Sequence, residues 1–577
     1  MHFPLGIVSD ILSSVVGWVS DSGNSANSDH LISHSTIKEI NAVRQRWGIP
    51  GMSVAVVTSQ SFHSHHHDGD GVQFLNFGTA TNDGRPVDSD SLFCIASNSK
   101  LFTALSVLKM IDDGFTVPNG ALLTLSTKVK DVLPEWDLMD EYAASTADIA
   151  DLMSMRSGMP SHDFSYDNVL PAETVANLAR LRPSAEFRQV FQYQNGHYVA
   201  LAHMVPTLTG VPFIQYVEKH FFAPLGMSAT TYNHTAAAAS GHRTDGHTHT
   251  GLNMTECVAK STLGNHKKRH KSCHGSIAPF GWFTDTDGTV NAGPGGIISS
   301  ARDVARWLAE LLDPQVVPAH LLAAAAEPRV VVGNKSMPGA DNLPSLYGAG
   351  QFIHSYRGHR VVSHTGGVPG QQTLIARLPE AGMAVAVLTN DADFGSYAFH
   401  TVFAAIVDNM LGLKPLDVET EWFRRYTANA FGPIKKNGAE PAYGFGAVPG
   451  RYKGAGYGTL KLEPLNHGDP VHARLPLELA RFGMASKHVF VAPYHRIFGT
   501  HLVFTHWDGP HFNWTVLIAR HPDQGFGKGT LANGPAIITP TGIGMFGGFS
   551  VPGEGAPHKH LAVETCEEGS EVWFARK

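Results

Sequence analysis

Apolar residues follow one another almost without a break from Leu101 to Ile111, where the polar turn Asp112-Asp113-Gly114 stops them. Because they occupy nearly every helical face, this pattern predicts a helix buried in the middle of a domain. A second apolar helical pattern runs from Tyr198 to Val205 and ends near Gly210. Helical patterns of this kind dominate residues 98–230.

Strand-like patterns flank this helical part on both sides. Runs at 51–58 and 73–77 follow a helix expected over 35–47, and the pattern from 346 to 391 turns to strands again before a helix over 397–411. Loops are expected from 235 to 290. We therefore predict an α+β domain over residues 35–431, in which an antiparallel sheet is built from both ends of the domain and a helical subdomain is inserted between them.

The pattern changes after a Pro-, Lys- and Gly-rich linker at 432–447. Short strand-like runs at 450–453, 459–462, 488–492, 501–506 and 512–519 are separated by Gly, Pro and Asp. They predict a small antiparallel barrel or sandwich over residues 448–577. At the other end of the chain, residues 1–34 are predicted to be a weakly ordered leader.

Length and charge narrow the possible functions. A chain of 577 residues with 43% hydrophobic and 16% charged residues is expected to fold into two or three domains. The formal net charge is -7, and no basic stripe interleaved with aromatic residues indicates nucleic acid as a partner. The basic run Lys267–Lys271 is interpreted as a solvated loop. No apolar stretch reaches the length of a membrane span.

Cysteine and histidine usage predicts neither a disulfide framework nor a metal centre. Cys257 and Cys273 flank the basic run and could pair in an oxidising compartment, whereas Cys94 is interpreted as a packing residue. The apolar N-terminus contains Asp10 and matches a secretory signal poorly, so the compartment stays open between cytoplasm and secretion. No cofactor is expected, because a cluster in an apparent hairpin insertion has no patterned carboxylate or cysteine partners; it consists of His63, His65, His66 and His67.

Ser97 and Lys100 form the strongest candidate for chemistry. Residues three apart share one face of a helix, so the Lys100 amine can reach the Ser97 hydroxyl at the mouth of the apolar helix. A serine hydroxyl is a poor nucleophile until a neighbour takes its proton. Ser35 and Lys38 repeat the spacing, but they begin a polar helix, so context favours the pair at 97–100.

Two further short patterns supply the partners that a serine–lysine mechanism needs. Tyr193 and Asn195 stand at the entrance of the second apolar helix, and the triplet His364–Gly366 follows a strand-like run and precedes another. Both spacings recur elsewhere, at Tyr166–Asn168 and His249–Gly251. Those copies lie in stretches that are interpreted as loops.

These three ordered patterns make the chain similar to the serine beta-lactamase and penicillin-recognising superfamily, in its class C and esterase branch, over about residues 35–415. The resemblance implies a beta-lactamase/transpeptidase-like fold and no cofactor. It implies that Ser97 is acylated, that Lys100 and Tyr193 share the acid and base roles, and that Asn195 holds the acyl group. Oxyanion and substrate contacts would come from the Ser97 backbone and from the strand residues His364, Thr365, Gly366 and Gly367. The C-terminal module resembles the lipocalin-like module of some relatives.

Departures from the family pattern bear on the substrate. His364 stands where beta-lactamases carry a lysine, which removes a cation that would attract a substrate carboxylate, and Gly367 stands where serine is common. No Ser-Asp-Asn triplet and no Gly-x-Ser-x-Gly elbow occur. We therefore expect hydrolysis of a small-molecule ester first, of a peptide or amide second, and acyl transfer third. A non-catalytic penicilloyl-binding or scaffold protein is the alternative. The sequence does not predict an oligomeric state.

Overall fold

The computed structural model describes residues 30–59, 71–167, 169–253, 271–283, 289–333, 343–429, 438–466, 486–518, 527–547 and 565–577, with a few more between 256 and 260 and between 468 and 479. Most of the predicted leader, the histidine cluster at 63–67 and most of the basic run at 267–271 lie outside the described residues.

An eight-stranded antiparallel sheet forms the centre of the larger part, in the order β2-β1-β12-β11-β10-β9-β8-β7. The two N-terminal strands join directly onto the later ones through the β1–β12 pairing. This confirms the predicted antiparallel sheet built from both ends. The strands are β1 (Gly51–Thr58), β2 (Val72–Gly78), β7 (Val330–Gly333), β8 (Ser345–Tyr347), β9 (Phe352–Tyr356), β10 (His359–Val368), β11 (Gln371–Leu378) and β12 (Met383–Thr389).

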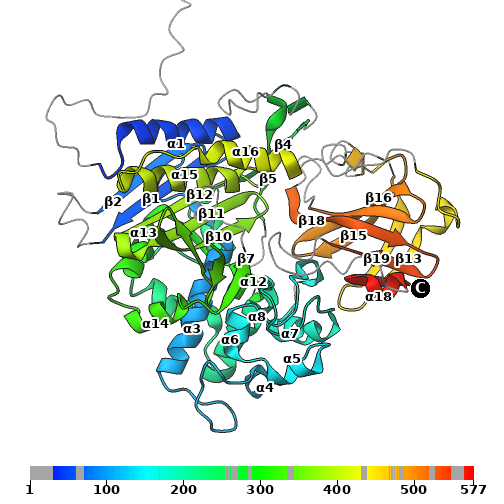
Figure 1. The fold of residues 1–577 in the computed structure, drawn as a ribbon, viewed down its shortest axis with the longest axis horizontal. Helices are drawn as coiled ribbons and strands as arrows, with labels where there is room; N and C mark the ends of the chain where they lie inside the picture. The colour runs from blue at the N-terminus through cyan, green and yellow to red at the C-terminus, as the bar shows by residue number, and fades with distance from the viewer. Residues whose placement is uncertain are drawn as a thin grey trace, which may run out of the picture.

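Helices cover both faces of this sheet (Figure 1). Side chains alternate across a strand, and in β1 Val54 and Val56 pack with one core whereas Ala55 and Val57 pack with the other. The first core includes α1 (His34–Trp47), α15 (Gly395–Met410) and α16 (Val418–Asn429); the second includes α3 (Lys100–Asp112) and α13 (Ala301–Leu312). The sheet is therefore buried on both sides.

The inserted helical subdomain lies between β2 and β7 in the sequence. Its helices are α4 (Val129–Val132), α5 (Glu141–Thr146), α6 (Ile149–Met153), α7 (Pro171–Asn177), α8 (Asn195–Thr209), α9 (Phe213–Val217), α10 (His234–Ala239), α12 (Thr289–Gly295) and α14 (Ala319–Ala325). A short two-stranded sheet, β3 (Leu92–Cys94) with β6 (Ile298–Ser300), connects this part to the start of the α3 region.

The expectation of loops throughout 235–290 is wrong. This stretch contains α10 and a hairpin of β4 (Gly246–Thr250) with β5 (Ser276–Gly281). Polar residues fill β4, yet they are buried because partners distant in sequence satisfy them: the Thr248 hydroxyl donates to Asp393 at 2.7 Å and the His249 N–H donates to it at 2.8 Å. A hydrophobic pattern does not reveal a strand that is buried in this way.

The C-terminal region is a closed antiparallel barrel, which decides between the predicted barrel and sandwich. The five runs found in the sequence are all strands, and three further strands complete the barrel. The set is β13 (Gly450–Gly454), β14 (Gly458–Pro464), β15 (Val489–Arg496), β16 (Gly499–Asp508), β17 (His511–Ile518), β18 (Gly527–Ile538), β19 (Gly542–Met545) and β20 (Val572–Arg576).

Figure 1 shows the barrel beside the helical subdomain, and hydrogen bonds join the two on both sides of the short helix η2 (Asp163–Ser165). The Ile497 N–H, in the turn between β15 and β16, donates to the Tyr166 carbonyl at 3.1 Å. On the other side of η2, His162 Nδ1 lies 2.7 Å from the Tyr457 hydroxyl. The barrel thus holds the chain on both sides of η2.

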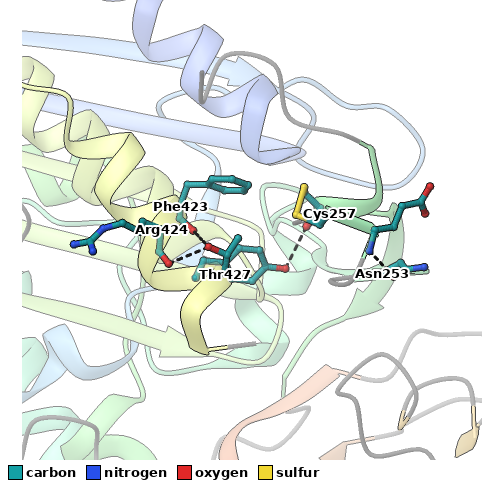
Figure 2. Close-up of a disulfide and its surroundings, with 8 residues drawn as sticks. Asn253, Cys257, Phe423, Arg424 and Thr427 are labelled. Carbon is teal, nitrogen blue, oxygen red and sulfur yellow. Dashed lines mark hydrogen bonds between the residues drawn. A yellow bond between two sulfur atoms is a disulfide. The ribbon is translucent and has the colours of Figure 1, made fainter. Parts of the chain in front are cut away.

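Cys257 and Cys273 form a disulfide, the pairing considered from the sequence. Figure 2 shows it beside α16, where the Tyr426 hydroxyl donates to the Cys273 carbonyl at 3.2 Å. Cys94 is buried with a free thiol. In the described part of the chain, no helix combines the length and the apolar character that crossing a membrane requires.

Candidate active site

Ser97 lies on a short 3-10 helix, η1 (Ala96–Ser99), that leads directly into α3. Lys100 is the first residue of α3 and is fully buried. Its amine donates to the Ser97 Oγ at 2.9 Å and to the Pro294 carbonyl at 2.7 Å. The preceding Ala96 has a left-handed backbone, with φ 48°, a conformation rare outside glycine. The predicted pair is therefore in hydrogen-bond contact at a tight turn.

The surroundings of Lys100 favour its uncharged form. Burial lowers the pKa of the Lys100 amine well below its usual range, and the nearby Asp163 carboxylate opposes this effect only in part. An amine without a permanent proton can accept one, and a lysine desolvated in this way is suited to act as a base.

Tyr193 lies on the other side of Lys100. The Lys100 amine is 4.8 Å from the centre of the Tyr193 ring, and that ring is 6.0 Å from the imidazole of His364. Tyr193 comes just before α8, as expected from the sequence, and Asn195 is the first residue of that helix. The structure thus brings together residues from α3, α8 and β10.

The second Tyr-x-Asn pattern has a structural role that the sequence did not reveal. Tyr166 is buried directly after η2, and its hydroxyl hydrogen-bonds to the Gln194 side chain. The Gly196 N–H also donates to that hydroxyl at 2.7 Å. Tyr166 therefore anchors the start of α8, the turn that carries Tyr193 and Asn195.

The sequence pattern suggested that the His364–Gly366 triplet follows a strand. In the structure the triplet lies within the strand β10. Glycine is required at 366 because β10 crosses η1 closely: a Cβ there would lie 2.1 Å from the Ile95 carbonyl oxygen. Any side chain would push the strand away from the turn that carries Ser97. Thr365 and Gly367 flank this crossing on β10.

His364 is a neutral imidazole in this setting. Burial lowers the pKa of His364 to about 3, and Lys100 acts in the same direction whenever its amine carries a proton. Its Nδ1–H donates to the Thr365 carbonyl at 2.6 Å, so Nε2 can accept from the Tyr347 hydroxyl 3.2 Å away. The site therefore lacks the cation that a lysine at this position would supply.

A cavity of about 520 Å³ opens over Ser97 between the sheet and the helical subdomain. Every residue proposed for the site from the sequence lines it, except Lys100, which lies beneath Ser97. The lining members are Ser97, Tyr193, Asn195, His364, Thr365, Gly366 and Gly367.

Two further residues of the cavity wall were not predicted from the sequence. Asp163 is 8% exposed, and both of its carboxylate oxygens accept from the Asn195 Nδ2 at 3.0 Å. Phe498, in the turn between β15 and β16, extends the wall from the barrel. Neither Asp163 nor Phe498 belongs to one of the three short patterns found in the sequence, so nothing there connects them with Ser97.

Among the described residues, no group of three or more His, Cys, Asp or Glu side chains is arranged to hold a metal ion. The side chains in and directly beneath the cavity include a hydroxyl, an amine, a phenol, amides, carboxylates and imidazoles.

The chain is similar in sequence to a known protein family and to two named proteins. The family model described as Beta-lactamase matches residues 40–408, which is more than half of the chain. An unguisins hydrolase of Aspergillus violaceofuscus is 26% identical over 463 residues, covering 74% of this chain and 75% of its own. Penicillin-binding protein 4 of Amycolatopsis lactamdurans is 24% identical over 66% of this chain and 91% of its own.

One solved structure shares the fold over most of the length. The octameric penicillin-binding protein homologue from Pyrococcus abyssi aligns with 88% of this chain and 97% of its own, with a TM-score of 0.51 and 19% identity.

Proposed function

This chain belongs to the beta-lactamase family, and from that premise we propose that it is a serine hydrolase that works through a covalent acyl-enzyme on Ser97. One observation carries the proposal: a fully buried lysine amine with a strongly lowered pKa lies 2.9 Å from the Ser97 hydroxyl, under a cavity large enough for a small acyl group. The relatives named as a hydrolase and a penicillin-binding protein support the same chemistry.

Acylation follows from this arrangement. The uncharged Lys100 amine takes the proton of Ser97 as the Oγ attacks the substrate carbonyl carbon. The resulting oxyanion is stabilised by the backbone N–H groups of Ser97 and Gly367, and losing one such donor typically costs about 10²- to 10³-fold in turnover. Tyr193 passes the proton to the leaving oxygen or nitrogen, whose bond to the carbonyl carbon then breaks. In the second half-reaction, water gives a proton to the Lys100 and Tyr193 pair as its oxygen attacks the acyl carbon. The bond from that carbon to the Ser97 Oγ then breaks, the Oγ takes the proton, and the carboxylic acid leaves.

The cavity favours esters and simple amides as substrates over penicillins. A penicillin carries a carboxylate, whereas His364 is neutral and the charged side chains on the wall, Asp163 and Asp393, are acidic. Taking a substrate carboxylate into such a site without a cation to pair with it is unfavourable.

Turnover of a 4-nitrophenyl ester and of a 4-nitroanilide tests this proposal. Wild-type protein should release many equivalents of the chromophore, and Ser97→Ala should release none above background. Ser35→Ala, which removes the exposed serine of the other Ser-x-x-Lys turn, is the matched control and should keep wild-type rates. Release of a single equivalent without turnover would instead indicate the non-catalytic binding protein. Full activity of Ser97→Ala would refute the assignment of the nucleophile.

A further inference from the structure

The Asp163 carboxylate is the most unusual group in the cavity wall. It is 8% exposed, and within the described part of the chain the hydrogen bonds to it come from the Asn195 amide, at 3.0 Å to each oxygen. A carboxylate has about four acceptor positions, so one amide nitrogen leaves acceptor capacity over. Burial raises the pKa of Asp163 to about 6, against the opposing effects of Asn195 and Lys100, and the group is therefore mainly charged at neutral pH.

This contact also fixes the direction of the Asn195 amide. A charged carboxylate accepts and does not donate, so the Nδ2 must face Asp163. The Oδ1 of Asn195 then points away from Asp163. Because Asn195 lines the cavity with Asp163, the pair presents acceptors to a bound molecule.

The rest of the wall does not supply a compensating cation. In the described part of the chain, neither lysine nor arginine lines the cavity. Burial lowers the pKa of the lining imidazoles, to about 3 at His364 and to about 4 at His400, so both are neutral at pH 7. The other lining carboxylate, Asp393, already accepts from the Thr248 hydroxyl and the His249 N–H.

Asp163 is also held rigidly. It begins η2, and His162 before it has a left-handed backbone, with φ 47°. The barrel holds both neighbours of Asp163, through the Tyr457 hydroxyl at His162 and the Tyr494 hydroxyl at the Phe164 carbonyl. An acceptor that is fixed in advance binds its partner with less loss of conformational entropy.

We propose that Asp163 and Asn195 form an acceptor subsite that selects substrates carrying an ammonium or other N–H group next to the scissile carbonyl. An incoming ammonium would donate hydrogen bonds to the remaining acceptor positions of Asp163. These bonds would compensate the carboxylate for the hydration that it loses through burial. Asp163 is a specificity residue on this account. The inference rests on the proposed acylation of Ser97 and adds the substrate class to it.

The test compares two esters that differ by the amine alone: phenylalanine methyl ester, as both enantiomers, and methyl 3-phenylpropanoate. The quantity measured at pH 7 is the ratio of kcat/KM for the amine ester to that for the neutral ester. Wild type is compared with Asp163→Asn, and Asp393→Asn is the matched control for loss of a carboxylate from the same wall. Because every form acts on the same two esters, their different intrinsic reactivity cancels between variants.

For at least one enantiomer, the ratio should fall about 10- to 100-fold in Asp163→Asn, the range expected for losing a hydrogen bond to a charged group. It should keep its wild-type value in Asp393→Asn. An unchanged ratio in Asp163→Asn, or an equal fall in both variants, would overturn the subsite.

A second measurement needs no variant and no turnover. Phenethylammonium should slow the labelling of Ser97 by a fluorophosphonate in wild-type protein, and 3-phenylpropanoate at the same concentration should not. Equal protection by both ions, or protection by the carboxylate alone, would contradict the subsite even if Asp163→Asn failed to fold.

If the neutral ester is turned over and Ser97 is labelled while no amine preference exists, the hydrolase stands and the subsite alone fails. If wild type neither labels nor turns over any ester, the proposed function fails first.

Discussion

Two turns of this protein carry the same Ser-x-x-Lys spacing in opposite environments. Ser35 and Lys38 lie on α1 with both side chains exposed, and the Ser35 hydroxyl is 3.0 Å from that of Ser33. At the second turn Lys100 is fully buried and hydrogen-bonds to Ser97. In both turns the spacing places the lysine on the same helical face as the serine. Desolvation, which lowers the pKa of Lys100, is what makes one pair suited to chemistry.

The histidines of the two His-Thr-Gly triplets are both buried, but their pKa values move in opposite directions. Burial lowers the pKa of His364 to about 3. Burial acts in the same direction on His249, but the Asp391 carboxylate at 2.6 Å outweighs it and raises the pKa of His249. A neighbouring charged group therefore decides in which direction the pKa of a buried histidine moves. His249 lies in β4 and hydrogen-bonds to the buried Asp391 carboxylate, whereas His364 belongs to the cavity wall.

The largest effect on activity is expected from replacing the lysine of each Ser-x-x-Lys turn, in separate variants. Lys100→Met keeps an apolar stem of similar length but removes the base, so kcat/KM for an ester should fall about 10²- to 10⁴-fold. Lys38→Met, the matched control, should stay within about twofold of wild type because an exposed side chain on α1 contributes little. Similar rates for the two variants would mean that burial of the lysine does not distinguish the two turns.

The glycines of the two triplets form a second matched pair. Gly366→Ala would place a Cβ 2.1 Å from the Ile95 carbonyl and move β10 away from Ser97, so kcat should fall about 10²-fold, as misplacement by about 1 Å can do. Gly251 has φ 68° and open space around its Cβ position. Gly251→Ala should therefore cost only about 1 kcal/mol of unfolding free energy and leave kcat unchanged. Urea denaturation and steady-state kinetics on both variants measure this, and an active Gly366→Ala would contradict the close crossing.

The two tyrosines should separate activity from stability. Tyr193→Phe removes the hydroxyl that transfers the proton, so kcat should fall about 10²-fold with the unfolding free energy unchanged. Tyr166→Phe removes the buried hydrogen bond to the Gln194 side chain and one of the two acceptors of the Gly196 N–H, the other being the Gln194 Oε1 at 2.8 Å. It should lower the unfolding free energy by about 1–3 kcal/mol. Chemical denaturation and kinetics on both variants test the division. A Tyr166→Phe variant of full stability would show that this hydroxyl does not anchor α8.

The smallest effect concerns pH. The Asp163 carboxylate raises the pKa of Lys100 against the effect of burial. Asp163→Asn removes that negative charge, so the Lys100 ammonium loses its proton at lower pH. The acid limb of the profile of fluorophosphonate labelling rate against pH should therefore move to lower pH. A shift to higher pH would mean that Asp163 is not coupled to Lys100 in this sense.

Much of this architecture is predictable from the sequence because it depends on local patterns. Uninterrupted apolar runs predicted α3 and α8, and turn residues between short apolar runs predicted the first five barrel strands. The hairpin of β4 and β5 was missed because distant partners such as Asp393 bury its polar residues. Strands β18 to β20 also lay outside the predicted runs.

The candidate site likewise contains residues that local sequence patterns predicted and residues that they did not. Residues in short ordered patterns, such as Ser97 and Tyr193, were found, and the structure brings them to one cavity. Asp163 and Phe498 were not found, because each reaches the cavity through tertiary packing of η2 and of the barrel turn. No local pattern encodes that approach.

The role of Ser97 as the nucleophile is tested most directly by the intact mass of the protein after incubation with a fluorophosphonate, for wild type, Ser97→Ala and Ser35→Ala. We expect a single adduct on wild type and on Ser35→Ala, formed at the same rate, and none on Ser97→Ala. An adduct of equal rate on Ser97→Ala, or its loss in Ser35→Ala, would contradict the claim that the buried turn carries the nucleophile.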